Sequence, residues 1–377
     1  MSIRIAVPKE TREGERRVAL DPATATRFVK LGAEVALERG AGEEAHFPDA
    51  AYTDVEFRED GSSLCSDADV VLRVSPPTVE EAGLLKEGSV LVGVLQPHLN
   101  LDLVKVLVDR GITSFAMELV PRISRAQSMD VLSSQAAVAG YKVALMAANL
   151  ASQFFPMLTT AAGTIRPAKV VVVGAGVAGL QAIATAKRLG AMVEAYDIRP
   201  AAREQVESLG AKMIDTGVSA EGEGGYAREL TEEEKVKQAE VLARHVAAAN
   251  AVITTASIPG RSAPRIITRE MVEAMKPGSV VVDLAAESGG NCELTEAGRT
   301  VNHGGVLVAG PTNIASSIPI HATEMYAKNL LNFLTPMIQD GQLAPDWDDE
   351  VIADSALTHA GEIRHAPTRA LVEGEAS

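Results

Sequence analysis

Short apolar runs recur along the first third of the chain, separated by stretches whose apolar positions repeat with a helical period. Short runs rich in Val, Ile and Leu predict buried strands, and the amphipathic stretches predict helices. This alternation is typical of a parallel sheet with helices on both faces. The expected strands are 3–8, 34–38, 70–74, 90–95 and 113–117, and the expected helices are 22–31, 79–86 and 101–109.

The alternation returns after residue 169, beyond a long helical pattern over 130–150 and a polar, Pro-containing stretch at 152–168. Later strands are expected at 192–196, 251–256, 280–285 and 306–309, a second long helix at 316–338, and short strands at 350–353 and 356–358. Because the chain crosses between its halves twice, we expect the C-terminal segment to rejoin the first domain. Residues 372–377 are expected to be disordered.

The pattern therefore predicts an α/β protein with two doubly wound, parallel-sheet (Rossmann-like) domains joined by two long helices. The first domain comprises residues 1–135 and 328–377, and the second comprises residues 136–327. A cofactor cleft is expected between the two domains.

One segment of the second half carries a specific chemical signal. A valine run at 170–173 leads into Gly174, Gly176 and Gly179, and a second strand ends at Asp197. In dinucleotide-binding turns these glycines permit the tight turn, the approach of a pyrophosphate and close helix packing. The amides that open the following helix face the phosphates. An acid about 20 residues further on binds a ribose 2′-hydroxyl and repels a 2′-phosphate, so the segment predicts NAD rather than NADP.

The composition removes several function classes. A net charge of −15 argues against nucleic acid and anionic membrane surfaces as direct partners. The two cysteines, Cys65 and Cys292, lie in no CxxC spacing, which favours a reduced cytoplasmic compartment. The chain begins without an apolar signal segment. Residues 143–165 carry no charge, but their polar residues and Pro156 favour a buried helix and loop over a membrane span.

Basic, amide, acidic and hydroxyl side chains gather at 122–135, before the first long helix. Asp130 has two interpretations, a helix N-terminal residue or part of a polar clamp. In the clamp, Arg122 or Arg125 would hold a carboxamide or carboxylate. Gln127, Asp130 and Ser133 would orient a nicotinamide and its ribose. A glycine-rich segment at 217–226 around Tyr226 is either a tolerated insertion or a mobile surface loop.

The opening segment 7–20 resembles alanine dehydrogenases and, equally, the NAD-binding component of proton-translocating NAD(P) transhydrogenases, two families similar over nearly their full length. Residues 122–135 match the transhydrogenase loop named for its Arg, Gln and Asp, and 276–292 and 328–336 are also transhydrogenase-like. The resemblance covers about residues 1–365. It assigns the clamp arginine to Arg122 and makes Tyr226 part of a loop that closes over NAD(H).

Departures from the pattern separate the two relatives. Alanine dehydrogenases supply an arginine, a lysine, a histidine and an aspartate, which fall on Arg17, Ser75, Gln96 and Glu287. Serine and glutamine transfer no proton usefully at pH 7, whereas hydride transfer between two nicotinamides needs no acid or base. His98, two residues beyond Gln96, keeps the dehydrogenase open as an alternative, although Pro97 indicates that the strand has ended. A non-catalytic NAD sensor is a third hypothesis.

The resemblance thus implies the NAD(H)-binding alpha subunit, or domain I, of a proton-translocating transhydrogenase. It would transfer a hydride between NADH and NADP⁺ held on a partner component. Expected partners are a second copy in a homodimer, a membrane-domain subunit and an NADP(H)-binding beta subunit, with no transmembrane segment in this chain. The expected location is peripheral, on the cytoplasmic face of the inner membrane.

We expect no metal site. The catalytic residues expected are Arg122, Gln127, Asp130 and Ser133, and the cofactor-binding residues are Gly174, Gly176, Val177, Ala178, Gly179, Asp197, Ile198, Arg199, Tyr226 and Ala256.

Overall fold

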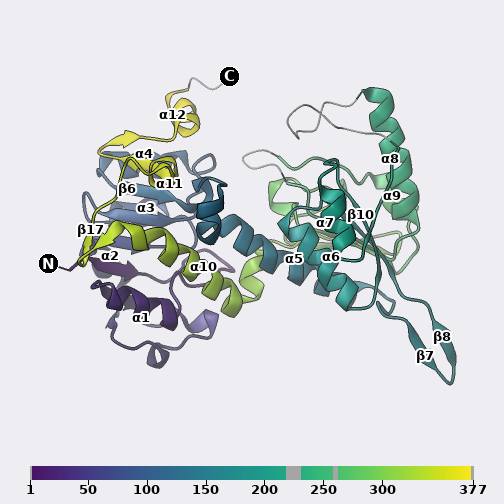
Figure 1. Cartoon of the computed structure of the whole chain (residues 1–377), viewed down its shortest axis with the longest axis horizontal. Coiled ribbons are helices and arrows are strands. Elements are labelled where there is room, and N and C mark those ends of the chain that lie inside the picture. The colour runs from purple at the N-terminus through teal and green to yellow at the C-terminus, as the bar shows by residue number, and fades with distance from the viewer. Residues whose placement is uncertain (1, 218–230, 258–261, 375–377) are drawn as a thin grey trace. The chain divides into compact units, whose positions relative to one another are not determined.

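The computed structural model describes residues 2–217, 231–257 and 262–374 (Figure 1). The chain divides into two compact units, Met1–Gln135 with Ser316–Ser377, and Ala136–Ala315. We expected the return to the first unit at residue 328, within the helix α10 (Pro319–Leu334). All of α10 belongs to the first unit, because Tyr326 and Ala327 are buried in the core of that unit.

The first unit contains an eight-stranded sheet in the order β19-β18-β6-β5-β4-β1-β2-β3. The six strands from β3 to β6 are parallel, in the doubly wound order 3-2-1-4-5-6. The strands are β1 (Arg4–Val7), β2 (Glu34–Glu38), β3 (Glu56–Arg58), β4 (Val70–Leu72), β5 (Val90–Gly93), β6 (Thr113–Ala116), β18 (Ala356–His359) and β19 (Glu362–Ile363). Strand β18 pairs antiparallel with β6, so the C-terminal segment adds two strands to the sheet of the first unit.

Alternate side chains of this sheet enter two separate cores, as expected for strands buried on both faces. One core packs against α1, α10 and α11, and the other against α2, α3 and α4. The helices of this unit, besides α10, are α1 (Pro22–Lys30), α2 (Gly61–Ser66), α3 (Val79–Gly83), α4 (Leu101–Asp109), α11 (Glu350–Ser355) and α12 (Ala366–Glu373). The sheet and its helices thus form a three-layered α/β unit.

The second unit has a seven-stranded sheet in the order β11-β10-β9-β12-β13-β15-β14, in which only β14 is antiparallel among the strands described. Its strands are β9 (Lys169–Val173), β10 (Met192–Tyr196), β11 (Lys212–Met213), β12 (Ala251–Thr254), β13 (Val280–Asp283), β14 (Thr300–His303) and β15 (Val306–Ala309). One face packs against α5 (Val131–Leu150), α6 (Val177–Arg188) and α7 (Ala202–Ser208), and the other against α8 (Glu232–Ala247) and α9 (Arg269–Glu273). The strand order reverses between β9 and β12, so both units are doubly wound.

Three expectations about local structure are wrong. Residues 350–353 are helical, in α11, because Asp349 caps the helix by accepting a hydrogen bond from the Val351 amide. Residues 372 and 373 are the last turn of α12 rather than disordered, and Gly374 ends it in the left-handed region; 375–377 lie outside the described residues. The stretch 152–168 contains a hairpin, β7 (Leu158–Thr160) and β8 (Gly163–Ile165), where we expected only a loop.

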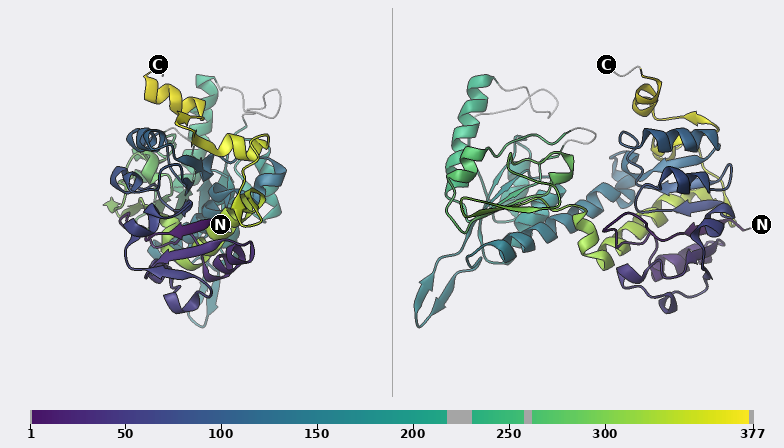
Figure 2. Two further views of the ribbon diagram at one scale, coloured as in Figure 1. Left: turned by 90° about the vertical axis from the view of Figure 1, so that its left-hand side faces the viewer. Right: turned by 180° about the vertical axis from the view of Figure 1, so that it is seen from behind.

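Helix α5 is long and apolar enough to cross a membrane by length and composition, and 39% of its most apolar window is buried. The core helix of a globular unit meets the same length and composition criteria. Ala139, Val143 and Ala147 of α5 pack in the core of the second unit, as in such a core helix. The hairpin β7–β8 projects from this unit, and every residue of both its strands is exposed (Figure 2).

Candidate functional site

The turn after β9 has the geometry that the glycine pattern predicts. Gly174 has φ +94°, in the left-handed region that side chains disfavour. A Cβ on Gly174 would lie 2.8 Å from Thr255 Oγ1 and 3.0 Å from the Ala256 nitrogen, so the turn lies directly against the chain beyond β12. A Cβ on Gly179 would overlap the carbonyl oxygen of Gly174. Helix α6 therefore begins at backbone contact with its own turn.

The space in front of α6 is open. Gly176 is the N-cap residue of α6, and a Cβ built on it meets nothing within 4 Å in the part of the chain that is described. Among the described residues, no side chain caps the N-terminus of α6, and the first turn of α6 contains no acidic residue. Val177 is 44% exposed. The uncapped amides and the positive end of the helix dipole form a site suited to an anion such as a pyrophosphate.

Asp197 follows β10 and connects to the same turn. Its carboxylate accepts hydrogen bonds from the Ala175 amide (2.7 Å) and from the Arg199 amide (2.8 Å). The Arg199 guanidinium also binds it, with distances of 3.0 Å from Nε and 2.9 Å from Nη2. Burial opposes ionisation, but these hydrogen bonds outweigh it and hold the pKa of Asp197 below its usual value. The acid is thus ionised and fixed beside the glycine turn, while Ile198 is exposed.

Ala256 lies on the other side of the turn and is held by Asn291. The Asn291 amide accepts from the Ala256 nitrogen (3.0 Å) and donates to the Ala256 oxygen (2.8 Å). Asn291 is held in turn by Asp283, a fully buried carboxylate that accepts from its backbone amide (2.7 Å). No role is assigned to Asn291 or Asp283 from the sequence. Asp283 does offer a usable signal, because it is a carboxylate that ends a buried strand at the carboxyl edge of a parallel sheet.

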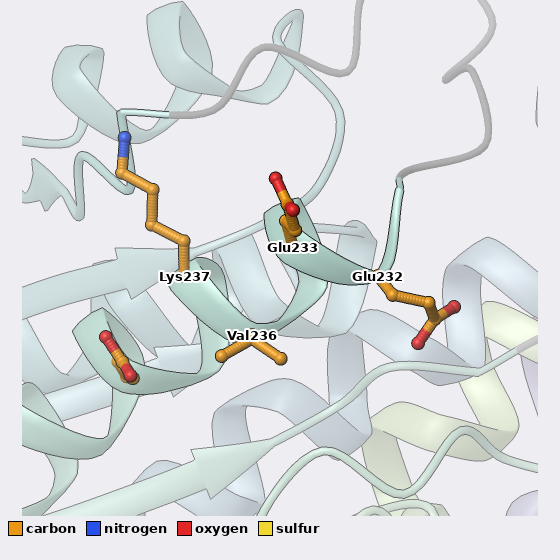
Figure 3. A pocket seen from close by; sticks show the side chains of 5 residues that line it. Glu232, Glu233, Val236 and Lys237 are labelled. Carbon is orange, nitrogen blue, oxygen red and sulfur yellow. The ribbon is translucent and has the colours of Figure 1, made fainter.

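Tyr226, expected to cover the cofactor, lies outside the described residues. A shallow hollow on α8 is lined by Glu232, Glu233, Val236, Lys237 and Glu240 (Figure 3). Three of these five side chains are carboxylates, so the hollow is poorly suited to phosphate groups.

In the first unit, the polar segment at 122–133 forms the 3-10 helix η4 (Ser124–Met129) and the start of α5. Asp130 accepts hydrogen bonds from the Ser133 amide (2.9 Å) and the Ser133 hydroxyl (2.6 Å). Asp130 therefore lies at the N-terminus of α5 and accepts a hydrogen bond from an amide of its first turn. Its carboxylate and the Ser133 hydroxyl also form a hydrogen-bonded pair.

The two candidate arginines differ in their contacts. Arg125 binds Asp349 through both terminal guanidinium nitrogens, at 2.9 and 2.6 Å, which fixes η4 to the start of α11. Arg122 and Gln127 are exposed, and neither side chain has a hydrogen-bond or ion-pair partner among the residues described. Both side chains are therefore available to a ligand.

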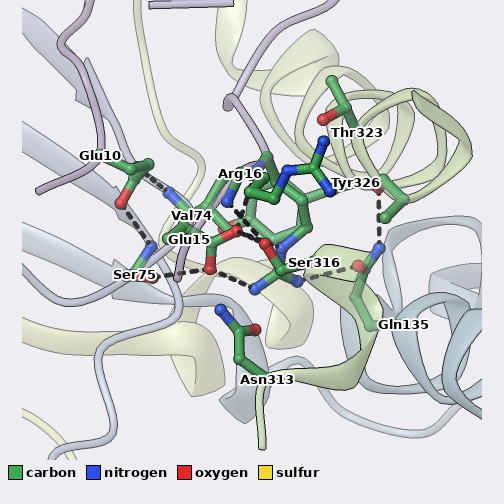
Figure 4. Close-up of polar contacts among 12 residues, drawn as sticks. Glu10, Glu15, Arg16, Val74, Ser75, Gln135, Asn313, Ser316, Thr323 and Tyr326 are labelled. Atoms are coloured by element: carbon green, nitrogen blue, oxygen red, sulfur yellow. Dashed lines mark hydrogen bonds and ion pairs between the residues drawn. The ribbon is translucent and has the colours of Figure 1, made fainter. Parts of the chain in front are cut away.

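A second polar cluster surrounds the buried carboxylate of Glu15 (Figure 4). The Arg17 guanidinium donates to this carboxylate from Nε (2.8 Å) and Nη2 (2.7 Å), and from Nη1 to Gln135 (2.9 Å). Glu15 also accepts from the hydroxyls of Ser75 (3.2 Å) and Ser316 (3.0 Å). Arg17, whose counterpart in alanine dehydrogenases is expected to bind a substrate carboxylate, is already neutralised by a carboxylate of its own chain.

The loop after β5 carries the remaining candidate acid–base residue. Strand β5 ends at Gly93, and Gln96 has φ +46°. Residues 97–99 form a turn in which His98 is exposed. His98 would point to the same side as Gln96 only in an extended segment, so this support for a dehydrogenase is lost, as Pro97 indicated.

Comparison with known proteins gives the same picture over both units. The chain matches the alanine dehydrogenase/PNT N-terminal domain over residues 6–139 and the alanine dehydrogenase/PNT C-terminal domain over residues 143–366. It is 48% identical over 376 residues to the first part of the NAD(P) transhydrogenase alpha subunit of Rhodospirillum rubrum, covering 96% of this chain and 98% of that one. The transhydrogenase structure from Sinorhizobium meliloti matches with a TM-score of 0.88 at 46% identity, covering 96% and 99% of the two chains. The alanine dehydrogenase of Mycobacterium tuberculosis is more distant, at 29% identity over 95% of this chain and 94% of its own.

Proposed function

Because this chain belongs to the alanine dehydrogenase/PNT family, we propose that it is the NAD(H)-binding subunit of a proton-translocating transhydrogenase. In this function a hydride leaves C4 of NADH and adds to C4 of the nicotinamide of NADP⁺, giving NAD⁺ and NADPH. The NADP⁺ is held on a partner component. No proton moves in this step, so the chain needs no acid or base for it.

The observation that carries the proposal is the state of Arg17. An amino-acid dehydrogenase needs a cation free to bind a carboxylate and a group that transfers a proton. Here Glu15 already occupies the guanidinium, and Ser75 and Gln96 stand at the lysine and histidine positions. The glycine turn and Asp197 meanwhile retain what NAD(H) binding requires.

The roles of the individual residues follow from their chemistry. The α6 amides of Val177 and Ala178 would bind the pyrophosphate, where Gly176 leaves room for it, and Asp197 would bind the adenosine ribose. Gln127 and Arg122 would hold the nicotinamide carboxamide, and the Asp130–Ser133 pair its ribose. The protein supplies orientation and exclusion of water, the contributions on which hydride transfer depends.

The partners proposed are an NADP(H)-binding beta subunit and a membrane-domain subunit, to which proton movement would belong. The relatives' name, subunit alpha, supports the need for other subunits. We propose that the chain acts as a homodimer, peripheral to the cytoplasmic face of the inner membrane.

The decisive experiment measures hydride transfer from NADH to an NADP⁺ analogue, with and without a purified NADP(H)-binding component of a transhydrogenase. We expect rapid turnover only in the mixture. Turnover of NAD⁺ with an amino acid by the chain alone would instead establish the dehydrogenase, which the family shared with alanine dehydrogenases keeps as the second candidate. NADH binding with no transfer in either test would leave a non-catalytic sensor.

Replacing Gln127 tests the orienting role within this function. Gln127→Asn shortens the side chain by one methylene and withdraws the amide from the nicotinamide, so hydride transfer should slow by ~10- to 100-fold. NADH affinity, measured by fluorescence titration, should change by less than about threefold, since most binding contacts remain. An equal loss of affinity and rate would contradict an orienting role.

A further inference from the structure

A buried amide on α10 contacts the loop that carries Gln127 and Asp130 at two points. Asn329, only 7% exposed, donates from Nδ2 to the carbonyl oxygen of Ser128 at 2.8 Å. Its Oδ1 accepts a hydrogen bond from the Ser134 hydroxyl at 2.6 Å. One side chain therefore connects the end of η4 to the first turn of α5.

These two contacts lie on either side of Asp130 and Ser133, and the first is directly next to Gln127. Ser128 follows Gln127 directly, and Ser134 follows Ser133. Asp130 lies between them, where its carboxylate holds Ser133. Asn329 thus contacts the backbone carbonyl at one end of the 128–134 segment and the Ser134 side chain at the other, from a helix that is itself buried in the core of the first unit.

A second amide contacts the same carbonyl without making the bridge. Asn332, one turn along α10 and more exposed, donates to the Ser128 oxygen at 3.0 Å but has no described contact with Ser134. The carbonyl oxygen accepts two donors, so it stays satisfied if Asn332 is removed. Loss of the Asn329 amide, by contrast, removes the side-chain bridge between Ser128 in η4 and Ser134 in α5.

We propose that Asn329 is a positioning residue for hydride transfer. This inference rests on the proposed function. The Gln127 side chain has no partner of its own in the described structure, so its position depends on the backbone that carries it. By holding Ser128 and Ser134, Asn329 sets where the Gln127 amide and the Asp130–Ser133 pair present themselves to a dihydronicotinamide.

The test compares Asn329→Asp with Asn332→Ala in the full chain, mixed with the NADP(H)-binding component. The aspartate keeps the shape and the acceptor for Ser134 but replaces the donor to Ser128 with a carboxylate oxygen. We expect hydride transfer at saturating NADH to fall by ~10- to 100-fold, because a small displacement of a positioning group costs that much. NADH affinity should stay within about twofold, and the rate with NADH deuterated at the transferred position should show a larger isotope effect than wild type.

Asn332→Ala is the matched control and should transfer hydride at a rate within about twofold of wild type. Ser134→Ala, which removes the other end of the bridge without adding charge, should reproduce the Asn329→Asp pattern in weaker form. It also serves if Asn329→Asp does not fold. A parallel fall of rate, NADH affinity and melting temperature would overturn the positioning role, and so would full activity of both variants. A wild-type chain that binds NADH but transfers no hydride would overturn the proposed function itself, which is a different result.

Discussion

The surroundings of Asp197 bury its carboxylate and also stabilise its ionised form. Burial alone would favour the neutral acid, but Arg199 and the Ala175 amide donate to both carboxylate oxygens and lower its pKa. An ionised acid accepts hydrogen bonds from ribose hydroxyls and repels a phosphate. The arginine that keeps it charged is about half exposed, so it can move when a ribose arrives.

Replacing this acid should change both affinity and selectivity. We expect Asp197→Asn to weaken NADH binding by ~10-fold or more, since hydrogen bonds to a charged group contribute about 1.5–3 kcal/mol. NADPH should be discriminated against less strongly, because the repelling charge is gone. Fluorescence titration with both nucleotides measures this, and Arg203→Ala, a charge change at an exposed position nearby on α7, is the control. Unchanged selectivity would remove Asp197 from the ribose site.

The same carboxylate should make stability depend on pH. Its pKa is lower in the folded chain than its ordinary value of 3.8, so its stabilising contribution is complete above that value. The contribution is lost as the pH falls through the folded pKa. Urea unfolding of wild type and Asp197→Asn should therefore differ at pH 7, and the difference should shrink as the pH falls below 3.8. A difference independent of pH would contradict the charge-based explanation.

At the scale of residues, a sequence motif predicts which residues lie in a site but not which residues they hydrogen-bond to. The spacing from the glycines along the sequence predicts Asp197. Its pairing with Arg199 depends on the path of a short loop, which that spacing does not specify. Asn291 and Asn329 had no signal, because each works by joining segments that are far apart in the sequence. Contacts of this kind depend on the fold and not on local pattern.

At the scale of elements, the turn before α6 separates two roles for glycine. A Cβ at position 179 would overlap the Gly174 carbonyl, whereas position 176 faces open space among the residues described. Helix α5 approaches as closely, since a Cβ on Gly140 would overlap the Ala178 carbonyl. The start of α6 is thus in close backbone contact with its own turn and with α5, while the space beside Gly176 is open among the described residues.

A pair of alanine variants should distinguish these roles. Gly179→Ala must push α6 away from its turn, so we expect destabilisation by about 1–3 kcal/mol, as for other overpacked sites. Gly176→Ala should leave the melting temperature nearly unchanged but weaken NADH binding at least ~10-fold, because the methyl group occupies space a pyrophosphate needs. Normal NADH affinity in Gly176→Ala would place the phosphates elsewhere.

The strands and helices show which elements a pattern can predict. The valine-rich runs at 70–72, 170–173 and 280–283 are strands because a fully buried parallel sheet requires continuous apolar segments. Residues 350–353 fit a strand by pattern, because a short apolar run suits either state, and the cap at Asp349 is what makes them helical. Strand β3 and helix α2 were not predicted, because their sequences are short and mostly polar.

At the scale of the whole molecule, the segment 151–165 carries no charge, although the chain as a whole is acidic. It carries Phe154, Met157 and Ile165, which are 53%, 64% and 46% exposed, and an open two-stranded hairpin. A net charge of −15 makes most surfaces repel a second copy, but this segment does not. Open strand edges need hydrogen-bond partners, which another chain supplies and lipid does not. These features support the hairpin as the contact in the proposed homodimer.

Charging the hairpin should therefore release monomers. We expect Met157→Glu to convert the dimer to a monomer in light scattering, because two copies would bring like charges into an apolar contact. NADH affinity should be unchanged, since the hairpin leads into the start of β9 and the glycine turn lies at its other end. Arg166→Glu, a charge change just outside the segment, is the control. A Met157→Glu dimer as stable as wild type would exclude this contact.

The order of the strands along the chain also bears on how the protein is made. The first unit is interrupted by the second, and strand β6 acquires its neighbour β18 only after residues 117–355 have been translated. The second unit is continuous, so it can complete its sheet while the first still exposes the edge of β6. On the ribosome, the unit begun first should therefore finish last. Nascent chains halted before residue 356 should present an unpaired edge, a natural target for chaperones and a route to aggregation.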